Sequence, residues 1–189
     1  MGQPRPSRHA RRAVAIATAV GALTAASGCA VLGLTGSGNQ VLDSISVSSP
    51  RLSEDAPLPA NYSCKGKNGN PPLRWSGVPA DRTESLAIVV DSALENPQVH
   101  WVLFNIDPRT TELGENLGDN LPEGARQGRT SNGKVGYSPP CRESDNYRFS
   151  VYALDGKLSQ PEGAPLSETL AAIADRTIAR GRLTVINIE

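Results

Sequence analysis

Three short apolar segments constrain the fold of this chain most strongly. They are residues 86–90 (LAIVV), 99–106 (VHWVLFNI) and 147–154 (YRFSVYAL). Each is rich in β-branched or aromatic residues, and each is bounded by Pro, Gly or Asp, which favour turns. We therefore expect a mainly β domain with these segments as the central strands of its sheet.

The chain between the second and third segments has the composition of a loop. Residues 107–141 are heavy in Gly, Pro, Asn and Thr, so we expect an ordered loop that contains short strands. Long loops of this kind often carry function. Alternation of apolar and polar residues predicts two further strands, at 44–48 (SISVS) and 183–188 (LTVINI).

One helix is predicted near the C-terminus. Ser167 is its expected N-cap, and Gly181 is expected to end it. Between them, apolar residues such as Leu170, Ile173 and Ile178 fall on one helical face. The fold class is thus mainly β with one clear C-terminal helix.

The first 28 residues have the features of an export signal. They contain four arginines and no acidic residue, and an uncharged run, 13–26 (AVAIATAVGALTAA), follows the arginines. A membrane span needs about 20 apolar residues, so this run is too short for one. We expect a cleaved signal peptide over residues 1–28.

Cys29 is the expected lipidation site. The sequence Ala26-Ser27-Gly28-Cys29 resembles a lipobox, although such motifs usually carry Leu where this chain has Ala26. Ordinary cleavage near the same place is the alternative, and Arg11-Arg12 also fits a twin-arginine export signal. A diacylglycerol group with acyl chains such as palmitate would hold the protein on the membrane surface.

The remaining chain is expected to form a tether and one domain. Residues 29–40 contain a Gly, Ser and Thr stretch without periodicity, which predicts a flexible, lipidated tether. Residues 41–189 form the domain. We expect an exported protein, lipid-anchored at the outer face of the cytoplasmic membrane or in the cell envelope.

The charge of the exported part argues against nucleic-acid binding. The whole chain has 19 basic and 19 acidic residues, and four of the basic ones lie in the signal. The exported part is therefore mildly acidic, whereas a nucleic-acid partner requires a basic face.

Two cysteines remain after Cys29, namely Cys64 and Cys141. In an oxidising compartment we expect them to form a disulfide. A metal site and a reactive thiol are the alternatives, but one histidine and two distant cysteines do not make a zinc motif. The segment 128–134 (GRTSNGK) begins like a P-loop but lacks the Ser or Thr and the helix that must follow. We expect no metal and no cofactor.

His100 and Asp91 are the first candidates for a functional site. His100 lies within a predicted strand, where alternation places it on one face with Val102 and Phe104. It is either a packed, hydrogen-bonded core histidine or an imidazole that projects into a pocket. Asp91 ends the preceding strand and is either a solvated turn former or a functional carboxylate.

Several motifs, taken in order, resemble the phosphatidylethanolamine-binding protein family in its bacterial Raf-kinase-inhibitor-like branch. The likeness covers roughly residues 44–189, and its weight lies in the order of the motifs as much as in each match. The motifs are 62–66 (YSCKG), 70–75 (NPPLRW), 100–106 (HWVLFNI), 121–124 (LPEG), Gly136-Tyr137, Pro140-Cys141 and 147–155 (YRFSVYALD).

The resemblance implies a β-sandwich-like fold of antiparallel sheets with a small pocket at the strand ends. It also implies that Cys64 and Cys141 lie close together. Carried over by position, the ligand-binding residues are Asp91, His100, Pro140 and Tyr147, with Asp145 where the family has a second histidine.

The departures from the family pattern bear on the ligand. Asp145 adds a negative charge in a partly desolvated place, which predicts weaker binding of a phosphoryl head group. The family's D-P-D-A-P has become Asp91-Ser92-Ala93-Leu94, and prolines after the cysteine are replaced, one of them by Arg142, which could compensate. A neutral or cationic small ligand, or no ligand, stays open.

Three functions fit the sequence. The favoured one is a noncatalytic small-ligand-binding or protein-interaction module at the membrane, whose protein partner the sequence does not identify. The second is a hydrolytic acid/base enzyme that uses His100 with Asp91 and Asp145, although neither Ser92 nor Ser138 is placed beside His100 as a nucleophile. The third is a structural or inhibitory envelope protein with a vestigial pocket.

Overall fold

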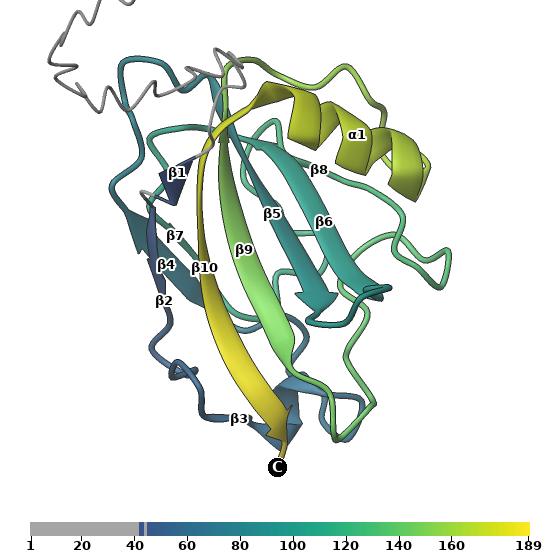
Figure 1. Cartoon of the computed structure of the whole chain (residues 1–189). Helices are drawn as coiled ribbons and strands as arrows, with labels where there is room; N and C mark the ends of the chain where they lie inside the picture. The colour runs from purple at the N-terminus through teal and green to yellow at the C-terminus, as the bar shows by residue number, and fades with distance from the viewer. Residues whose placement is uncertain (1–41, 44) are drawn as a thin grey trace, which may run out of the picture. The chain divides into compact units, whose positions relative to one another are not determined.

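The computed structural model describes residues 42–43 and 45–189 (Figure 1). The predicted signal peptide, the tether and Cys29 lie outside the described residues. No helix in the described part of the chain is long and apolar enough to cross a membrane.

The domain consists of two sheets and one α-helix. The strand order is β1-β10-β9-β5-β6-β8 in the large sheet, with β3 also paired to β10, and β2-β4-β7 in the small sheet. The elements are β1 (Leu42–Asp43), β2 (Ser46–Ser48), β3 (Pro57–Leu58), the 3-10 helix η1 (Ala60–Tyr62), β4 (Leu73–Ser76), β5 (Ser85–Ser92), β6 (Val99–Ile106), β7 (Glu112–Leu113), β8 (Arg126–Gln127), β9 (Tyr147–Leu154), α1 (Leu166–Arg176) and β10 (Thr177–Ile188).

The three apolar segments form the centre of the large sheet, as predicted. Strands β6 and β9 have the expected bounds, and β5 is longer than expected by a few residues. The long loop holds only the short strands β7 and β8, which confirms that expectation too. The expected antiparallel pairing holds for the long strands, but β1 and β3 each pair with β10 in parallel.

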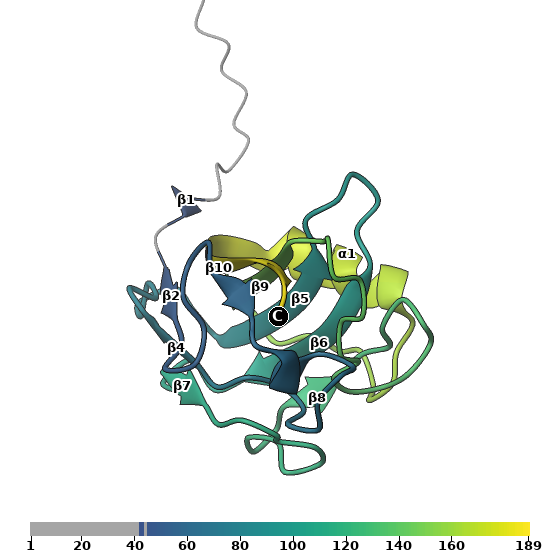
Figure 2. The same ribbon diagram turned by 90° about the horizontal axis from the view of Figure 1, so that it is seen from below.

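The central strands of the large sheet are covered on both faces, by α1 on one side and by the small sheet on the other (Figure 2). Leu86, Ile88 and Val90 of β5 pack toward the small sheet, in a cluster with residues of β2, β4 and β7. The alternate residues, Ala87 and Val89, pack in a second cluster with Ile173 of α1. Because side chains alternate across a strand, burial on both faces explains why this segment is a continuous apolar run.

The predicted helix bounds are wrong at both ends. The helix begins at Leu166 with Pro165 as its N-cap, so Ser167 lies inside it and makes no cap hydrogen bond. The helix ends at Arg176, and the predicted last turn with Ile178 and Gly181 belongs to β10. Residues 177–185 pair with β9 along its whole length, and this ladder outweighs the local helical pattern.

Gly181 illustrates why the strand prevails over the helix there. A side chain at this position would collide with the backbone oxygen of Ile45. The glycine therefore allows the segment before β2 to lie against β10, where the backbone N–H of Ile45 donates to the oxygen of Arg180 at 3.2 Å. Close approach of two backbones is a common reason for glycine in a strand.

A candidate small-molecule site beside His100

A β-bulge positions His100. Val90 pairs with Trp101 but Asp91 pairs with Val99, so His100 is an extra residue on β6. Bulges change the direction of side chains near functional sites. The prediction that His100 shares a face with Val102 and Phe104 is therefore wrong, because those two residues pack on the α1 side.

The imidazole of His100 is held by the loop after β8 and by β9. Its Nδ1 lies 3.0 Å from the backbone oxygen of Ser138, and its ring meets that of Tyr147 edge-on, with centroids 5.4 Å apart. A carbonyl oxygen only accepts hydrogen bonds, so Nδ1 carries the proton in the neutral ring. That tautomer leaves the Nε2 lone pair for another partner.

The charge on His100 is set by opposing effects. Burial lowers the pKa of the imidazole below its usual value, while the hydrogen bond to Ser138 and the nearby carboxylates of Asp91 and Asp145 oppose this shift. The net effect is a lowered pKa, so the ring is neutral at pH 7. At neutral pH His100 therefore offers an acceptor at Nε2 rather than a positive charge.

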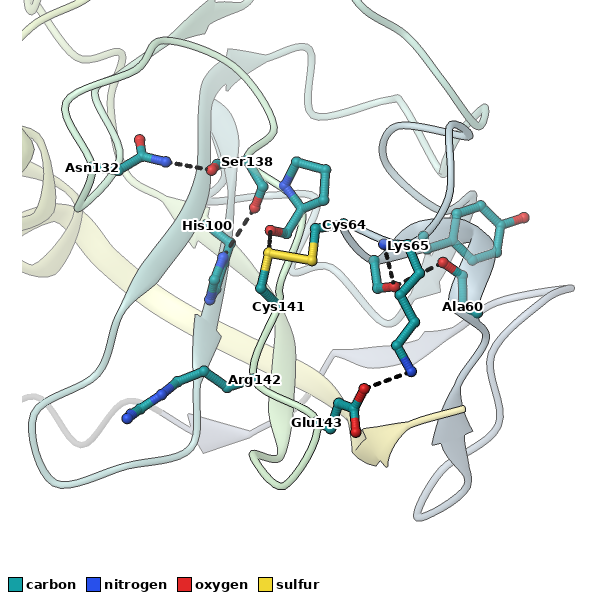
Figure 3. The surroundings of a disulfide bond; sticks show 12 residues. Ala60, Cys64, Lys65, His100, Asn132, Ser138, Cys141, Arg142 and Glu143 are labelled. Atoms are coloured by element: carbon teal, nitrogen blue, oxygen red, sulfur yellow. Dashed lines mark hydrogen bonds and ion pairs between the residues drawn. A yellow bond between two sulfur atoms is a disulfide. The ribbon is translucent and has the colours of Figure 1, made fainter.

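A cavity of about 400 Å³ opens beside His100. Figure 3 shows part of its lining, with Ser138 against the imidazole and Asn132 hydrogen-bonded to Ser138. Two lining residues, Lys134 and Arg142, are cationic, and none of the lining residues is acidic. The full lining is Cys64, Gln98, Val99, His100, Ser131, Asn132, Lys134, Ser138, Pro139, Cys141 and Arg142.

A disulfide forms one wall of this cavity. Cys64 and Cys141 are bonded, with their Cα atoms 5.2 Å apart and 77 positions apart in the chain, which confirms the predicted pairing (Figure 3). The backbone N–H of Cys64 donates to the oxygen of Pro140 at 2.9 Å, and Lys65 lies 2.8 Å from the carboxylate of Glu143. Together these contacts fix the loop that carries Arg142.

Of the five predicted ligand-binding residues, only His100 lines the cavity. Tyr147 supports the imidazole and donates its hydroxyl hydrogen to the backbone oxygen of Arg142 at 2.6 Å. Pro140 is buried and contributes its backbone oxygen to Cys64. Asp91 and Asp145 lie near enough to act on the charge of His100 but are absent from the lining.

Both aspartates have cationic partners. Arg148 binds the carboxylate of Asp91 through two nitrogens, at 2.9 Å and 2.6 Å. Asp145 is 9% exposed, and its carboxylate lies 3.9 Å from the guanidinium of Arg142. The acidic character that the sequence predicted for the pocket is thus largely offset by arginines.

Sequence reasoning missed most of the polar lining. Ser131, Asn132 and Lys134 lie in the segment that begins like a P-loop, where a tight turn brings Arg129 and Val135 into a β-bridge. The sequence feature that indicated this part of the site was the long loop 107–141, because such loops often carry function. The P-loop-like motif within it did not indicate the site.

The serines near His100 are not arranged as nucleophiles. The hydroxyl of Ser92 is buried and accepts from the backbone N–H of Gln98 at 2.8 Å. The hydroxyl of Ser138 accepts from the amide of Asn132 at 2.6 Å. Within residues 45–189 neither hydroxyl is hydrogen-bonded to the imidazole, so the geometry suits binding better than nucleophilic catalysis.

The two packed sheets and the cavity at the end of β6 define a small β domain with a ligand-sized hollow beside one histidine. The sequence model of the family described as Phosphatidylethanolamine-binding protein matches residues 48–187. The chain belongs to this family, which confirms the resemblance seen in the motifs.

Relatives and solved structures agree with this assignment. The chain is 39% identical to a UPF0098 protein of Methanothermobacter thermautotrophicus, over 67% of this chain and 87% of the relative. It is 36% identical to LppC of Mycobacterium tuberculosis, whose name describes it as a candidate lipoprotein, over 74% of this chain and 70% of the relative.

The fold is similar to two crystal structures. One is the phosphatidylethanolamine-binding protein homologue CT736 of Chlamydia trachomatis, with a TM-score of 0.67 and 30% identity over 78% of this chain and 99% of the other. The other is YbcL of E. coli, described as a member of the mammalian family, with a TM-score of 0.70 and 26% identity over 77% of this chain and 99% of the other.

Proposed function

We propose that this protein is a membrane-tethered, noncatalytic module that binds a small molecule with an anionic group in the cavity beside His100. The observation that carries the proposal is the charge of the lining. Lys134 and Arg142 contribute two cations, and the lining contains no carboxylate. A cavity of about 400 Å³ lies in the range typical of small-molecule sites, which is roughly 300 to 1,000 Å³.

This ligand class revises the expectation drawn from Asp145. A carboxylate in the lining would repel an anionic ligand, but Asp145 lies outside the lining and close to Arg142. Because Arg142 offsets the charge of Asp145, Lys134 gives the lining its net positive charge, with hydroxyl and amide groups of Ser131 and Asn132 as further hydrogen-bonding partners. An anionic group is favoured over a neutral or cationic one.

His100 adds a pH dependence to the proposed site. An anion placed against the imidazole favours the protonated ring, which can donate from Nε2. Because the ring is neutral without ligand at pH 7, binding would take up a proton. The affinity for the anion is then expected to rise as the pH falls toward the pKa of His100.

A thermal-shift series on the purified full chain in detergent tests the proposal. The probes are inorganic phosphate, phosphoethanolamine, choline and glycerol. We expect phosphate or phosphoethanolamine to raise the melting temperature while choline and glycerol do not. Equal shifts from all four probes, or no shift from the two anions, would overturn the anion site.

Matched variants locate the binding. Lys134→Ala and Arg142→Ala should each weaken anion binding by about tenfold, which corresponds to about 1.4 kcal/mol. Lys67 is exposed and does not line the cavity, so Lys67→Ala is the control for loss of one positive charge. If Lys67→Ala weakens binding as much as Lys134→Ala, the effect is one of net charge and the cavity is not the site.

The membrane tether is proposed from Cys29 and its lipobox-like context. The name of the LppC relative supports it. Two acyl chains hold a protein on a membrane far more firmly than one. We expect the wild-type protein to partition into the detergent phase and Cys29→Ser to move to the aqueous phase; a variant that stays in the detergent phase would refute lipid anchoring at Cys29.

A further inference from the structure

A second cavity lies beside Trp101. It has a volume of about 260 Å³ and shares no lining residue with the His100 cavity. The same loop separates the two, because Lys134 and Ser138 line the first cavity whereas Val135 and Tyr137 line the second. The full lining is Gly69, Asn70, Trp101, Asn116, Gly118, Asp119, Gln127, Val135, Gly136 and Tyr137.

Gln127 presents fixed hydrogen-bond donors to this cavity. Its backbone N–H donates to the carboxylate of Glu162 at 2.6 Å, and its Oε1 accepts from the indole N–H of Trp101 at 2.7 Å. An indole N–H can only donate, so this contact fixes which end of the amide is oxygen. The side-chain nitrogen then has two hydrogens for which the described residues provide no hydrogen-bond acceptor.

The donors of Gln127 open onto the cavity. The residue as a whole is only 5% exposed, but its side-chain nitrogen keeps contact with solvent, so water or a ligand atom can accept from it. Gly136 has φ of 96°, and a side chain there would lie 3.6 Å from the Gln127 nitrogen. The glycine thus leaves room beside the donors for a ligand atom.

A well-held loop supplies acceptors to the lining. Asp119 and Asn116, on this loop, both line the cavity. The loop is pinned by buried Asn70, whose amide nitrogen donates to the oxygen of Gly114 at 2.9 Å and whose amide oxygen accepts from the N–H of Leu117 at 2.9 Å. The site is therefore preorganised, which reduces the entropic cost of binding.

Apolar surface completes the cavity. Val135 is one of only two large hydrophobic residues in the described part of the chain that are markedly exposed, at 43%. Tyr137 also lines the cavity, and its ring is held by the hydrogen bond from its hydroxyl to the backbone oxygen of Tyr62 at 2.9 Å. Burial raises the pKa of Tyr137 far above its usual value, so this hydroxyl stays protonated.

The combination selects a class of ligand. The Gln127 donors favour a ligand acceptor, and the exposed carboxylate of Asp119 can accept from a ligand donor and repels anions. A hydroxyl group satisfies both requirements, and the C–H face of a sugar ring can pack on Val135 and Tyr137. The volume lies below the roughly 300 Å³ typical of the smallest drug-sized pockets, which suits one ring. We propose that this cavity binds a single uncharged sugar ring, independently of the His100 site.

NMR on the ¹⁵N-labelled full chain in detergent tests this proposal with glucose, galactose, mannose and arabinose as probes. We expect at least one sugar to shift the indole N–H signal of Trp101 and the side-chain amide signal of Gln127 in a saturable manner. Phosphate should leave both signals unmoved. If no sugar of the four shifts these signals, or if phosphate shifts them as strongly as a sugar does, the proposal fails.

Variants separate sugar binding from folding. Gln127→Glu keeps an oxygen for the Trp101 indole but removes the two donors, and Asp119→Asn changes an exposed side chain; each should weaken sugar binding at least tenfold. Asp81→Asn makes the same charge change at an exposed position outside the cavity and should bind as the wild type does. Wild-type affinity in Asp119→Asn and Gln127→Glu, with normal melting, would overturn the site.

Discussion

The guanidinium of Arg148 clamps the carboxylate of Asp91 through two hydrogen bonds, 2.9 Å and 2.6 Å long, between directly paired positions of β9 and β5. The sequence left Asp91 open as a turn former or a functional acid, and the structure makes it half of a partly buried ion pair. This pairing offsets the negative charge of Asp91 near His100, which helps the imidazole to stay neutral.

Removal of Arg148 should therefore affect both stability and His100. Arg148→Met leaves the Asp91 carboxylate, whose side chain is 16% exposed, without its partner, and the free energy of unfolding should fall by about 1 to 3 kcal/mol. The uncompensated carboxylate should also raise the pKa of His100, which an NMR titration of the ring protons measures.

The control for this variant is an exposed pair. Arg74 and Glu112 form a cross-strand ion pair with both side chains mostly exposed, so Arg74→Met should cost less than about 1 kcal/mol. An unchanged His100 pKa in Arg148→Met would show that the Asp91 charge does not reach the imidazole.

Stability should depend on pH through His100. Its pKa is lowered in the folded protein, so below about pH 6.5 the unfolded chain binds more protons than the folded one. The stability that depends on a neutral His100 is therefore fully present above the pKa that His100 has in the unfolded chain. The free energy of unfolding then decreases as the pH falls from that pKa toward the lower pKa of His100 in the folded protein. Urea unfolding at about pH 7.5 and about pH 5 should show a smaller decrease for His100→Gln than for the wild type; equal decreases would contradict this.

The disulfide should be complete and stabilising. Without reduction, alkylation should label neither Cys64 nor Cys141, and labelling of both would refute the bridge. The Cys64→Ser/Cys141→Ser double variant frees a long loop in the unfolded chain, so it should lose roughly 2 to 4 kcal/mol of unfolding free energy. A sample that is first reduced and denatured is the control for reagent access.

A methyl group at Gly181 should be costly. It would press on the backbone of Ile45, and neither backbone can yield without disturbing the contact between β10 and the segment before β2. We expect Gly181→Ala to lose about 1 to 3 kcal/mol in urea unfolding. At Gly114 the new atom would meet only the end of Leu117 at 3.9 Å, so Gly114→Ala should change stability by less than about 1 kcal/mol.

The site was only partly predictable because its lining comes from loops. Motif order pointed to His100 as a site residue, and the cysteine count pointed to the Cys64–Cys141 bridge, which the structure contains. Lys134 and Arg142 became site residues only when the loop after β8 and the loop before β9 folded against the same end of β6. Nothing local in the sequence indicates such an encounter.

The amino-acid sequence by itself determined the mainly β fold and its central strands, because continuous runs such as LAIVV are stable only when both faces of a strand are buried. Tertiary structure decided where α1 gives way to β10, since pairing with β9 outweighs a local helical pattern around Ile178. The tertiary structure also set the direction of the His100 side chain, through a β-bulge in β6. It likewise placed Arg148 beside Asp91, so that the guanidinium neutralises the carboxylate. These features depend on register between strands that are distant in the chain, which local periodicity does not encode.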